Sequence, residues 1–416
     1  MVGAPRKGSG ARHQLVEHLE ELQRLADTAG ATVLGEVTQM LDRPNPRTYL
    51  GKGKLEELKA RIGETNASLV IFDDELTPAQ GRNIEQALDT RVMDRAELIL
   101  DIFATRARTS EARMQVELAQ LQYTLPRLTR MWTHLEKFRG GIGVRGPGET
   151  QLETDRRLIN LRIKQLKEKL GDVQRSREVQ RQHRRGEFRA SLVGYTNAGK
   201  SSILRELAHA KDVFVEDRLF ATVDPLTRDV VMGENTHVLL TDTVGFIRKL
   251  PHDLVASFRA TLEEARDADL LLHVIDASHP VWEEHRHVVD QVLAELGLQE
   301  KPVLHVLNQV DRLDPDTLQG LQQRVRNVLP NSVFVSAVAP DGLEPLRRAL
   351  LLAVRKVRPE VELRLPMSDG RALAEIHRVG EVLEQRHENG EIVVRARLDE
   401  ATTGRLRGQG VKIGWP

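Results

Sequence analysis

Eight consecutive residues have the types and order needed to hold phosphate groups. Residues 194–201 read Gly-Tyr-Thr-Asn-Ala-Gly-Lys-Ser, a full match to G-x-x-x-x-G-K-[ST], and they follow an apolar run at 190–193. In such a loop, backbone N–H groups surround the phosphates, Lys200 neutralises β- and γ-phosphate oxygens, and Ser201 offers a hydroxyl to Mg²⁺. The pattern predicts a nucleotide site between a strand and a helix. We expect nucleotide contacts from Gly194, Tyr195, Thr196, Asn197, Ala198, Gly199, Lys200, Ser201 and Ser202.

A second string has the residues needed to sense a third phosphate. Asp242-Thr243-Val244-Gly245 ends another apolar run, as a D-x-x-G segment must if the carboxylate is to hold the metal and the glycine amide is to contact the γ-phosphate. Between the two strings, Phe220-Ala221-Thr222-Val223-Asp224 supplies Thr222 as an expected second Mg²⁺ ligand beside Ser201, present only with triphosphate. Thr227 is the alternative threonine. The residues that we expect to act in hydrolysis are Lys200, Thr222 and Gly245.

A third string is suited to recognising guanine. Asn308-Gln309-Val310-Asp311 follows an apolar run, and the Asp311 carboxylate would accept hydrogen bonds from the N1 and N2 donors that only guanine presents together. Ser336, Ala337 and Val338 follow the last apolar run and would add a backbone contact to guanine O6. Because the three strings occur in this order, each at the end of a strand-like run, they predict a guanine-nucleotide site.

The elements around these strings predict an α/β fold. After residue 188, strand-like runs alternate with helix-sized segments, which is typical of a parallel, doubly wound sheet. Together with the phosphate-binding and guanine-recognition strings, this pattern predicts the fold of a P-loop GTPase. We divide the chain into an N-terminal α/β domain (1–110), a basic helical hairpin (111–187), a nucleotide-binding domain (188–358) and a small α+β domain (359–416). In the last part, Asn389-Gly390 predicts a β-hairpin. The strands expected in the nucleotide-binding domain are 190–193, 238–240, 270–275, 303–307 and 333–335.

The predicted hairpin combines two apolar seams with an excess of positive charge. Residues 127–189 contain 17 Lys or Arg against 8 Asp or Glu, although the whole chain has 61 of each. Pro126 should kink the first helix. The seam residues are Met114, Leu118, Leu121, Leu125, Leu128, Trp132 and Leu135 in the first helix and Leu152, Ile159, Leu166 and Val173 in the second.

The hairpin also contains the candidate RNA contacts. The glycine-rich residues 140–148 form either a flexible turn or a functional tip whose single charge, Arg145, meets a phosphate. The charges of the second helix form either a solvated face or a stripe that faces RNA. The candidate RNA-binding residues are Arg139, Arg145, Arg156 and Arg157.

Composition excludes several other classes of protein. The chain has no Cys, so disulfides, thiolate catalysis and sulfur-ligated zinc are excluded. No window reaches the about 18 apolar residues of a membrane span, and residues 1–13 lack the apolar run of a secretory signal. We expect a cytoplasmic monomer and leave peripheral association with a membrane open.

Long strings inside and outside the nucleotide motifs resemble the HflX family of GTPases, in the Obg-like branch of the translation-factor class. The resemblance covers nearly the whole chain. It rests on residues 194–201 and on Asp-Thr-Val-Gly-Phe-Ile-Arg-Lys-Leu-Pro-His at 242–252, Phe-Asp-Asp-Glu-Leu-Thr-Pro-Ala-Gln at 72–80, Leu-Asp-Ile-Phe-Ala-Thr-Arg-Ala-Arg-Thr at 100–109 and the glycine-rich string beginning at 140. It implies a GTPase that binds the large ribosomal subunit and its rRNA and separates stalled or idle ribosomes under stress, with the hairpin tip directed towards the peptidyl-transferase region.

Three positions bear on the activity expected from this resemblance. Gln309 replaces the usual Lys of N-K-x-D, which covers the guanine and steadies the loop, so guanine preference could be weaker and ATP could compete. Phe246 stands where Ras-like proteins carry the Gln that orients the attacking water, so intrinsic hydrolysis should be slow. Asn197 occupies the place where related GTPases hold a potassium ion.

Two other readings remain open. One is an RNA remodeller driven by ATP or GTP, which competition of ATP with bound GDP would reveal. The other is an RNA-binding switch that barely turns over, which GTP turnover with and without ribosomes would reveal.

Overall fold

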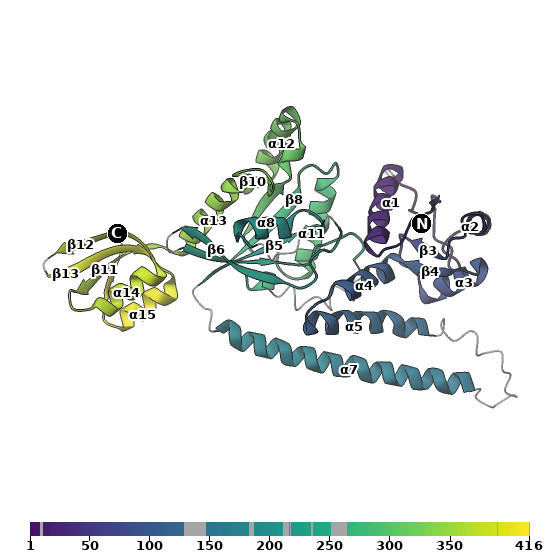
Figure 1. Cartoon of the computed structure of the whole chain (residues 1–416), viewed down its shortest axis with the longest axis horizontal. Coiled ribbons are helices and arrows are strands. Elements are labelled where there is room, and N and C mark those ends of the chain that lie inside the picture. The colour runs from purple at the N-terminus through teal and green to yellow at the C-terminus, as the bar shows by residue number, and fades with distance from the viewer. Residues whose placement is uncertain are drawn as a thin grey trace. The chain divides into compact units, whose positions relative to one another are not determined.

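The computed structural model describes residues 1–8, 11–128, 147–182, 187–210, 216, 218–233, 236–250, 264–388 and 390–415. They fall into two compact units. The first consists of Met1–Gln174 with Asp217–Val223 and Lys249–Arg259, and the second consists of Arg175–Glu216, Asp224–Arg248 and Ala260–Pro416. Figure 1 labels most of the elements of both units along the chain. Among the described residues, no helix combines the length and apolar character of a membrane span.

The first unit contains a four-stranded parallel sheet. The strands β1 (Val2–Gly3), β2 (Val37–Thr38), β3 (Leu69–Phe72) and β4 (Arg91–Asp94) lie in the order β2-β1-β3-β4. The helices of this part are α1 (Ala11–Thr28), α2 (Lys52–Thr65), α3 (Pro78–Leu88) and α4 (Arg95–Arg106). Thr77 begins α3 with a reciprocal capping box to Gln80. The predicted α/β character of this region is confirmed.

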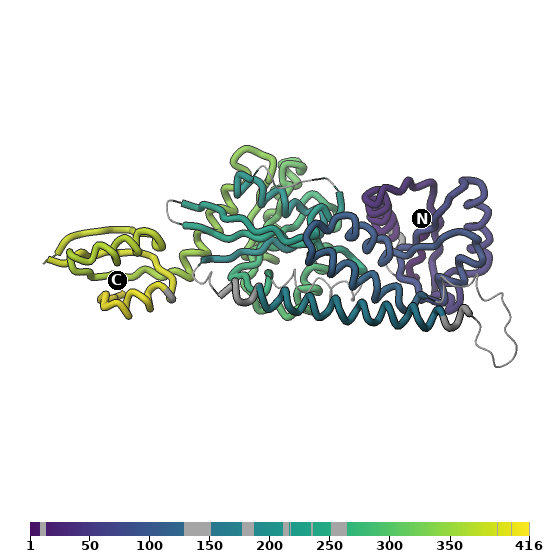
Figure 2. Tube along the Cα trace, turned by 60° about the horizontal axis from the view of Figure 1, so that its bottom comes forward, coloured from purple at the N-terminus to yellow at the C-terminus, as the bar shows by residue number. Residues whose placement is uncertain are grey.

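Two helices that follow lie side by side in the first unit. They are α5 (Ser110–Thr124) and α7 (Pro147–Gln182), of which the part up to Gln174 belongs to this unit; both views show them alongside each other (Figures 1 and 2). Arg162 of α7 donates two hydrogen bonds to the Glu117 carboxylate of α5, at 2.7 and 2.9 Å. At Pro126 the helix passes into a 3₁₀ turn, η1 (Leu125–Arg127), where a kink was predicted.

The described residues of the apolar seams are buried only in part, since Met114, Leu121, Leu125, Leu152, Ile159 and Val173 are half-buried. Leu118, Leu128 and Leu166 are buried. Trp132 and Leu135 lie outside the described residues, as does most of the glycine-rich string.

The second unit is built on a six-stranded sheet in the order β10-β9-β8-β5-β7-β6. Five strands are parallel: β5 (Phe188–Gly194), β7 (Thr236–Asp242), β8 (Leu270–Asp276), β9 (Val303–Asn308) and β10 (Ser332–Phe334). The sixth, β6 (Leu226–Gly233), is antiparallel to β7, so the sheet is mixed. The reason is the short connection from Gly233 to Thr236, because a few residues suffice to join antiparallel strands but not parallel ones.

Helices pack on this sheet through a core of two apolar clusters. The helices are α8 (Lys200–Leu207), α11 (Trp282–Glu295), α12 (Pro315–Val328) and α13 (Glu344–Val357). One cluster joins sheet residues such as Leu192, Leu240 and Leu272 to Ile203 of α8 and Leu346 of α13. The other joins Ile275 and Leu307 of the sheet to Trp282 of α11 and Val325 of α12. Because the strands are anchored by this core, their carboxyl ends are fixed, and the predicted nucleotide motifs lie there.

The chain ends in a four-stranded antiparallel sheet in the order β12-β13-β11-β14. The predicted hairpin is confirmed as β12 (Glu381–Glu388) and β13 (Glu391–Arg397), and Gly390 in its turn has φ +82°. The other elements are β11 (Glu360–Pro366), β14 (Lys412–Gly414), α14 (Gly370–Val379) and α15 (Glu400–Gly408).

Candidate nucleotide-binding site

The phosphate-binding loop connects β5 to α8, as its motif predicts. Lys200 begins the helix and is 6% exposed, and its Nζ donates hydrogen bonds to the carbonyls of Gly194 at 3.1 Å and Tyr195 at 2.8 Å. Burial lowers the pKa of Lys200 to about 8, while the Asp242 carboxylate acts in the opposite direction. The ammonium group is therefore held on the loop backbone, with little water to compete for an anion.

Asn308 ties this loop to the segments that follow β9 and β10. Its side-chain Nδ2 donates to the Ala198 carbonyl at 3.0 Å, and its Oδ1 accepts from the Ala337 N–H at 3.2 Å. Gly199 has φ +93°, and a Cβ there would lie 2.2 Å from Asn308 Nδ2, so only glycine permits this approach. The structure thus brings together two of the strings and the Ser336–Val338 segment.

The guanine-recognition string has its side chains fixed. Asp311 lies in the short helix η2 (Val310–Arg312), and Ser336 Oγ donates to its Oδ1 at 2.5 Å. Gln309 has φ +65°, and its Nε2 donates to the Asn197 carbonyl at 3.2 Å. Gln309 therefore links this string to the phosphate loop, which is one of the two tasks expected of the usual Lys. Val338, at 73% exposed, lies at the surface.

A hydroxyl and a carboxylate meet at the predicted metal position. Ser201 Oγ donates to Asp242 Oδ2 at 2.6 Å, and Asp242 at the end of β7 is fully buried. Thr243, next in the string, is also buried and donates to the Leu192 carbonyl at 2.7 Å. Both oxygens of the Ser201–Asp242 pair are of the hard type that Mg²⁺ prefers, so the donor set fits that ion.

The backbone after Asp242-Thr243-Val244 pairs with the phosphate loop. The Phe246 N–H donates to the Gly194 carbonyl at 3.0 Å, and the Phe246 carbonyl accepts from the Thr196 N–H at 2.7 Å. A Cβ at Gly245 would lie 2.7 Å from Thr196 Cα and 3.1 Å from Lys200 Nζ. Sequence reasoning identified Gly245 and Phe246 but missed this pairing, because it depends on how two distant segments meet.

The threonine expected to act as a switch belongs to the first unit. Thr222 is half-buried in the segment Asp217–Val223, between Ala221 and the buried Val223, and Asp224 follows in the second unit. Phe220, in the same segment, has φ +56° and packs edge-on against Phe103, with ring centroids 4.6 Å apart. The alternative, Thr227, lies on β6 with its hydroxyl 2.8 Å from that of Thr241. Thr222 as a metal ligand stays a prediction.

A buried ionic cluster in the first unit includes a residue four positions after Gly245. Asp73, at 3% exposed, accepts hydrogen bonds from Arg95 at 2.8 Å and from Lys249 at 2.6 Å. Lys249 also donates to Asp74 at 2.6 Å and has φ +52°. Burial raises the pKa of Asp73, and Lys249 opposes that rise. Asp73 and Lys249 lie in the strings 72–80 and 242–252, which indicated a family resemblance. No local pattern in the sequence predicts that the two side chains meet.

The candidate RNA-binding residues are described in part. Arg156 and Arg157 are exposed on α7. Arg139 and Arg145 lie outside the described residues.

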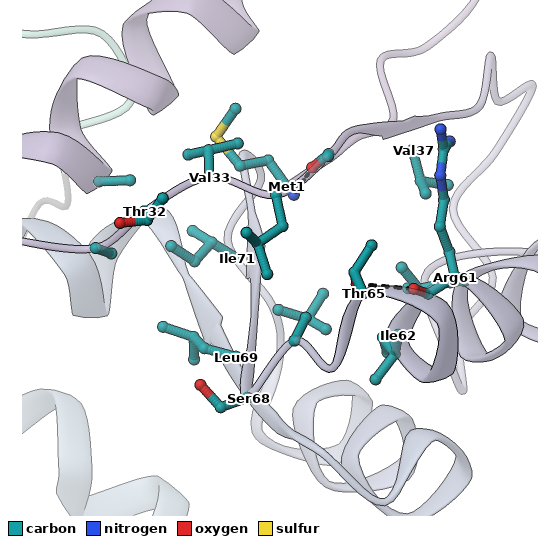
Figure 3. A pocket seen from close by; sticks show the side chains of 17 residues that line it. Met1, Thr32, Val33, Val37, Arg61, Ile62, Thr65, Ser68, Leu69 and Ile71 are labelled. Carbon is teal, nitrogen blue, oxygen red and sulfur yellow. Dashed lines mark hydrogen bonds between the residues drawn. The ribbon is translucent and has the colours of Figure 1, made fainter.

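The first unit also contains a cavity of about 220 Å³, shown in Figure 3. Its walls are mainly aliphatic, with Val33, Ile62, Leu69 and Ile71 among them. The cavity lies at the amino ends of β1 and β3, whereas open α/β sheets bind their ligands at the carboxyl ends of the strands. We therefore do not assign nucleotide binding to it.

Comparison with known proteins agrees with this geometry. Three family models match successive parts of the chain: the N-terminal region of a GTP-binding GTPase at residues 16–104, the middle region of such a GTPase at 106–184, and a 50S ribosome-binding GTPase at 189–309.

Similar proteins span almost the same length. A GTPase HflX from Magnetococcus marinus is 47% identical over 94% of this chain and 90% of its own, and one from Flavobacterium psychrophilum is 46% identical over 83% and 88%. A solved GTP-binding protein from Sulfolobus solfataricus in complex with GDP has 25% identity and a TM-score of 0.43 over 85% of this chain and 98% of its own. The sequence identity to the two curated relatives is higher, over most of the chain, than a shared fold alone requires. The chain belongs to the HflX family of GTPases.

Proposed function

We propose that this GTPase binds the large ribosomal subunit through rRNA contacts of α7 and uses GTP to separate stalled or idle ribosomes under stress. The proposal draws on the name of the family model that matches residues 189–309, which is a 50S ribosome-binding GTPase. The observation that carries it is a basic stripe on α7. Phosphate groups of RNA are bound through such cationic surfaces.

The stripe consists of five exposed cations: Arg156, Arg157, Lys164, Lys167 and Arg175. Arg156 and Lys167 are eleven residues apart, as are Lys164 and Arg175. Eleven residues are close to three turns of an α-helix, so the members of each pair share one face. Among the described residues, neither Arg156 nor Lys167 forms an ion pair, so both are available to phosphates.

Cations elsewhere on α7 have a different environment. Arg162 is held by Glu117 of α5 and stabilises the pair of helices. Lys169 is exposed, but its position in the helical repeat places it on another face from Arg156 and Lys167. Lys169 therefore offers a charge-matched control.

At the nucleotide site we propose that the loop Gly194–Ser202 binds the phosphates and that Asp311, with Ser336 and Ala337, reads the guanine. Ser201 and Asp242 would hold Mg²⁺, with Thr222 joining when a triphosphate is bound. The ion supplies charge neutralisation between the β- and γ-phosphates. Lys200 holds the phosphate oxygens from the loop side, and Gly245 offers its amide to the γ-phosphate. These assignments rest on the 2.6 Å Ser201–Asp242 contact and on the fixed positions of Asn308 and Asp311.

We also propose a potassium ion beside Asn197, whose side chain is exposed on the loop. Potassium would supply a cation where Phe246 provides no side chain to orient water. GTP turnover should be faster in potassium than in sodium at the same ionic strength. Equal rates in the two salts would contradict this part of the proposal.

The basic stripe can be tested by the salt dependence of binding. Replacing Arg156 and Lys167 together, as R156A/K167A, should weaken binding to purified large subunits. Since each phosphate contact adds about one to the slope of log affinity against log salt, the slope should fall by about two. Binding would be measured by sedimentation across a series of potassium chloride concentrations.

The control is Lys169→Ala, which removes one charge from another face of the same helix. It should leave the slope within error of the parent protein. An unchanged slope in R156A/K167A would show that the stripe is only solvated.

The role of the nucleotide can be tested on the parent protein. Sedimentation with ribosomal subunits should show tighter binding with a non-hydrolysable GTP analogue than with GDP or with no nucleotide. Light scattering of intact ribosomes should fall when the protein and GTP are added. Equal binding in all three nucleotide states would contradict the proposed coupling, and a constant scattering signal would contradict ribosome separation.

A further inference from the structure

The side chain of Tyr195, inside the phosphate loop, is directed at the segment after Gly245. Its hydroxyl oxygen accepts a hydrogen bond from the Arg248 N–H at 3.0 Å. Its ring is stacked on that of His285 from α11, with centroids 3.8 Å apart and planes at 6°. Tyr195 is 5% exposed, so both contacts are sheltered from water. A stacked ring cannot easily swing away, and the hydroxyl is thereby fixed in place.

Three hydrogen bonds hold residues 246–248 against the loop. Two of them are between backbone groups, from Phe246 N–H to Gly194 and from Thr196 N–H to Phe246. The third uses the Tyr195 hydroxyl. Only this third bond depends on the identity of a side chain, so it is the one that a substitution can remove without altering the backbone.

Residues 245–248, held against the phosphate loop in this way, form what we call the closed segment. It lies against groups that a third phosphate would need to contact. Gly245 packs so near the loop that a Cβ would lie 3.1 Å from Lys200 Nζ, and the Thr196 N–H is already bonded to the Phe246 carbonyl. A γ-phosphate that binds Lys200 and the Gly245 amide must therefore displace the Gly245–Phe246 backbone. GDP lacks that phosphate and makes no such demand. Any contact that stabilises the closed segment thus disfavours GTP relative to GDP.

We propose that Tyr195 is a positioning residue that holds this segment closed and so sets the preference of the protein between GDP and GTP. His285 acts through Tyr195, since it fixes the plane of the ring. This inference rests on the GTPase site alone and not on the ribosome, so the two can fail separately.

The test is the ratio of two affinities in Tyr195→Phe, measured with purified protein without ribosomes. This change removes the hydroxyl and keeps the stacked ring. Affinity for a non-hydrolysable GTP analogue should rise by about two- to tenfold, the net effect of losing one hydrogen bond in the closed form. Affinity for GDP should change by less than about twofold. His285→Ala should shift the ratio in the same direction.

The matched control is Tyr123→Phe, which removes a tyrosine hydroxyl from α5 in the first unit. It should leave the ratio unchanged. A proportional change of both affinities in Tyr195→Phe would overturn the proposal, as would a fall in affinity for the analogue. A lower melting temperature with an unchanged ratio would show a merely structural tyrosine. GDP binding by the parent protein confirms in the same assay that the nucleotide site is intact.

Discussion

Close contact between two backbones leaves no room for a side chain at Gly245 in the nucleotide site. A Cβ there would lie 2.7 Å from Thr196 Cα, a distance that real Cβ contacts essentially never show. Thr196 Cα is part of the phosphate loop, which is fixed by the hydrogen bond from Asn308 to Ala198. Moving the loop away would cost the free energy of that hydrogen bond. A side chain at 245 must therefore push the D-x-x-G segment away from Lys200.

Gly245→Ala should reduce GTP turnover at least about tenfold, because the methyl group would lie beside Lys200 and keep the Gly245 amide from the γ-phosphate that we propose it contacts. Turnover with excess GTP would be measured by phosphate release. Gly320→Ala is the control: no atom lies within 4 Å of a Cβ at Gly320, which is on α12. Alanine there should leave turnover unchanged and stabilise the helix by about 0.5–1 kcal/mol. Normal turnover in Gly245→Ala would contradict the packing argument.

At the scale of single residues, the sequence predicts the roles of residues that belong to short motifs. The roles expected of Lys200 and Ser201 follow from one short motif and that of Asp242 from another, because each motif needs particular residue types at a fixed spacing. The bonds from Gln309 to Asn197 and from Arg248 to Tyr195 join positions more than fifty residues apart. No local pattern indicates such pairs, and only the folded chain brings them together.

Among the secondary-structure elements, β8 contains a buried titratable group within the sheet. His273 is 1% exposed, and among the described residues neither ring nitrogen has a hydrogen-bond partner, although Asp290 of α11 lies 3.5 Å from Nδ1. His305 on β9 is its neighbour in register. Burial places the pKa of His273 well below its usual value, and the nearby His305, Arg286 and Lys200 lower it further. Burial also lowers the pKa of His305.

The unfolding free energy of the second unit should therefore fall in acid. A histidine whose pKa is lowered by folding binds its proton more readily in the unfolded chain, so stability is complete above about pH 6.5 and is lost as the pH drops below that value. His273→Leu should reduce the loss by up to about 1.4 kcal/mol per pH unit. Urea unfolding between pH 7.5 and 5.5 measures both proteins. Parallel pH profiles would rule out His273 as the source.

Elements were predictable where their apolar pattern was long. β8 and β9 lie at the residues expected, because each is a nearly continuous apolar run. β1 and β14 were missed because two or three residues carry no periodicity. β6 was missed because its residues, apart from the buried Val230, are half-buried or exposed and it lies at the edge of the sheet.

At the scale of the whole molecule, the stability of the first unit depends on the ionic cluster around Asp73. Arg95 is 1% exposed and pairs with both Asp73 and Glu21. Removing one member of such a buried cluster leaves an uncompensated carboxylate, which costs more than the loss of a surface pair.

Arg95→Ala should destabilise the first unit by about 3–5 kcal/mol. The control, Arg91→Ala, removes a cation that is 61% exposed and should change stability by no more than about 1 kcal/mol. Hydrogen exchange resolved along the chain would locate the effect, which should centre on residues up to Gln174. Equal losses in the two variants would contradict the burial argument.

Phe220 and Lys249 have a practical consequence for anyone who wishes to study hydrolysis on a shortened protein. Phe103 and Asp73, their partners, both precede residue 111. A fragment beginning at residue 188 would retain every nucleotide motif yet leave an aromatic ring bare and an ammonium group without its carboxylates. Rates of GTP hydrolysis measured on such a fragment would refer to a protein without these two contacts. Hydrolysis should therefore be measured on a chain that includes residues 1–187.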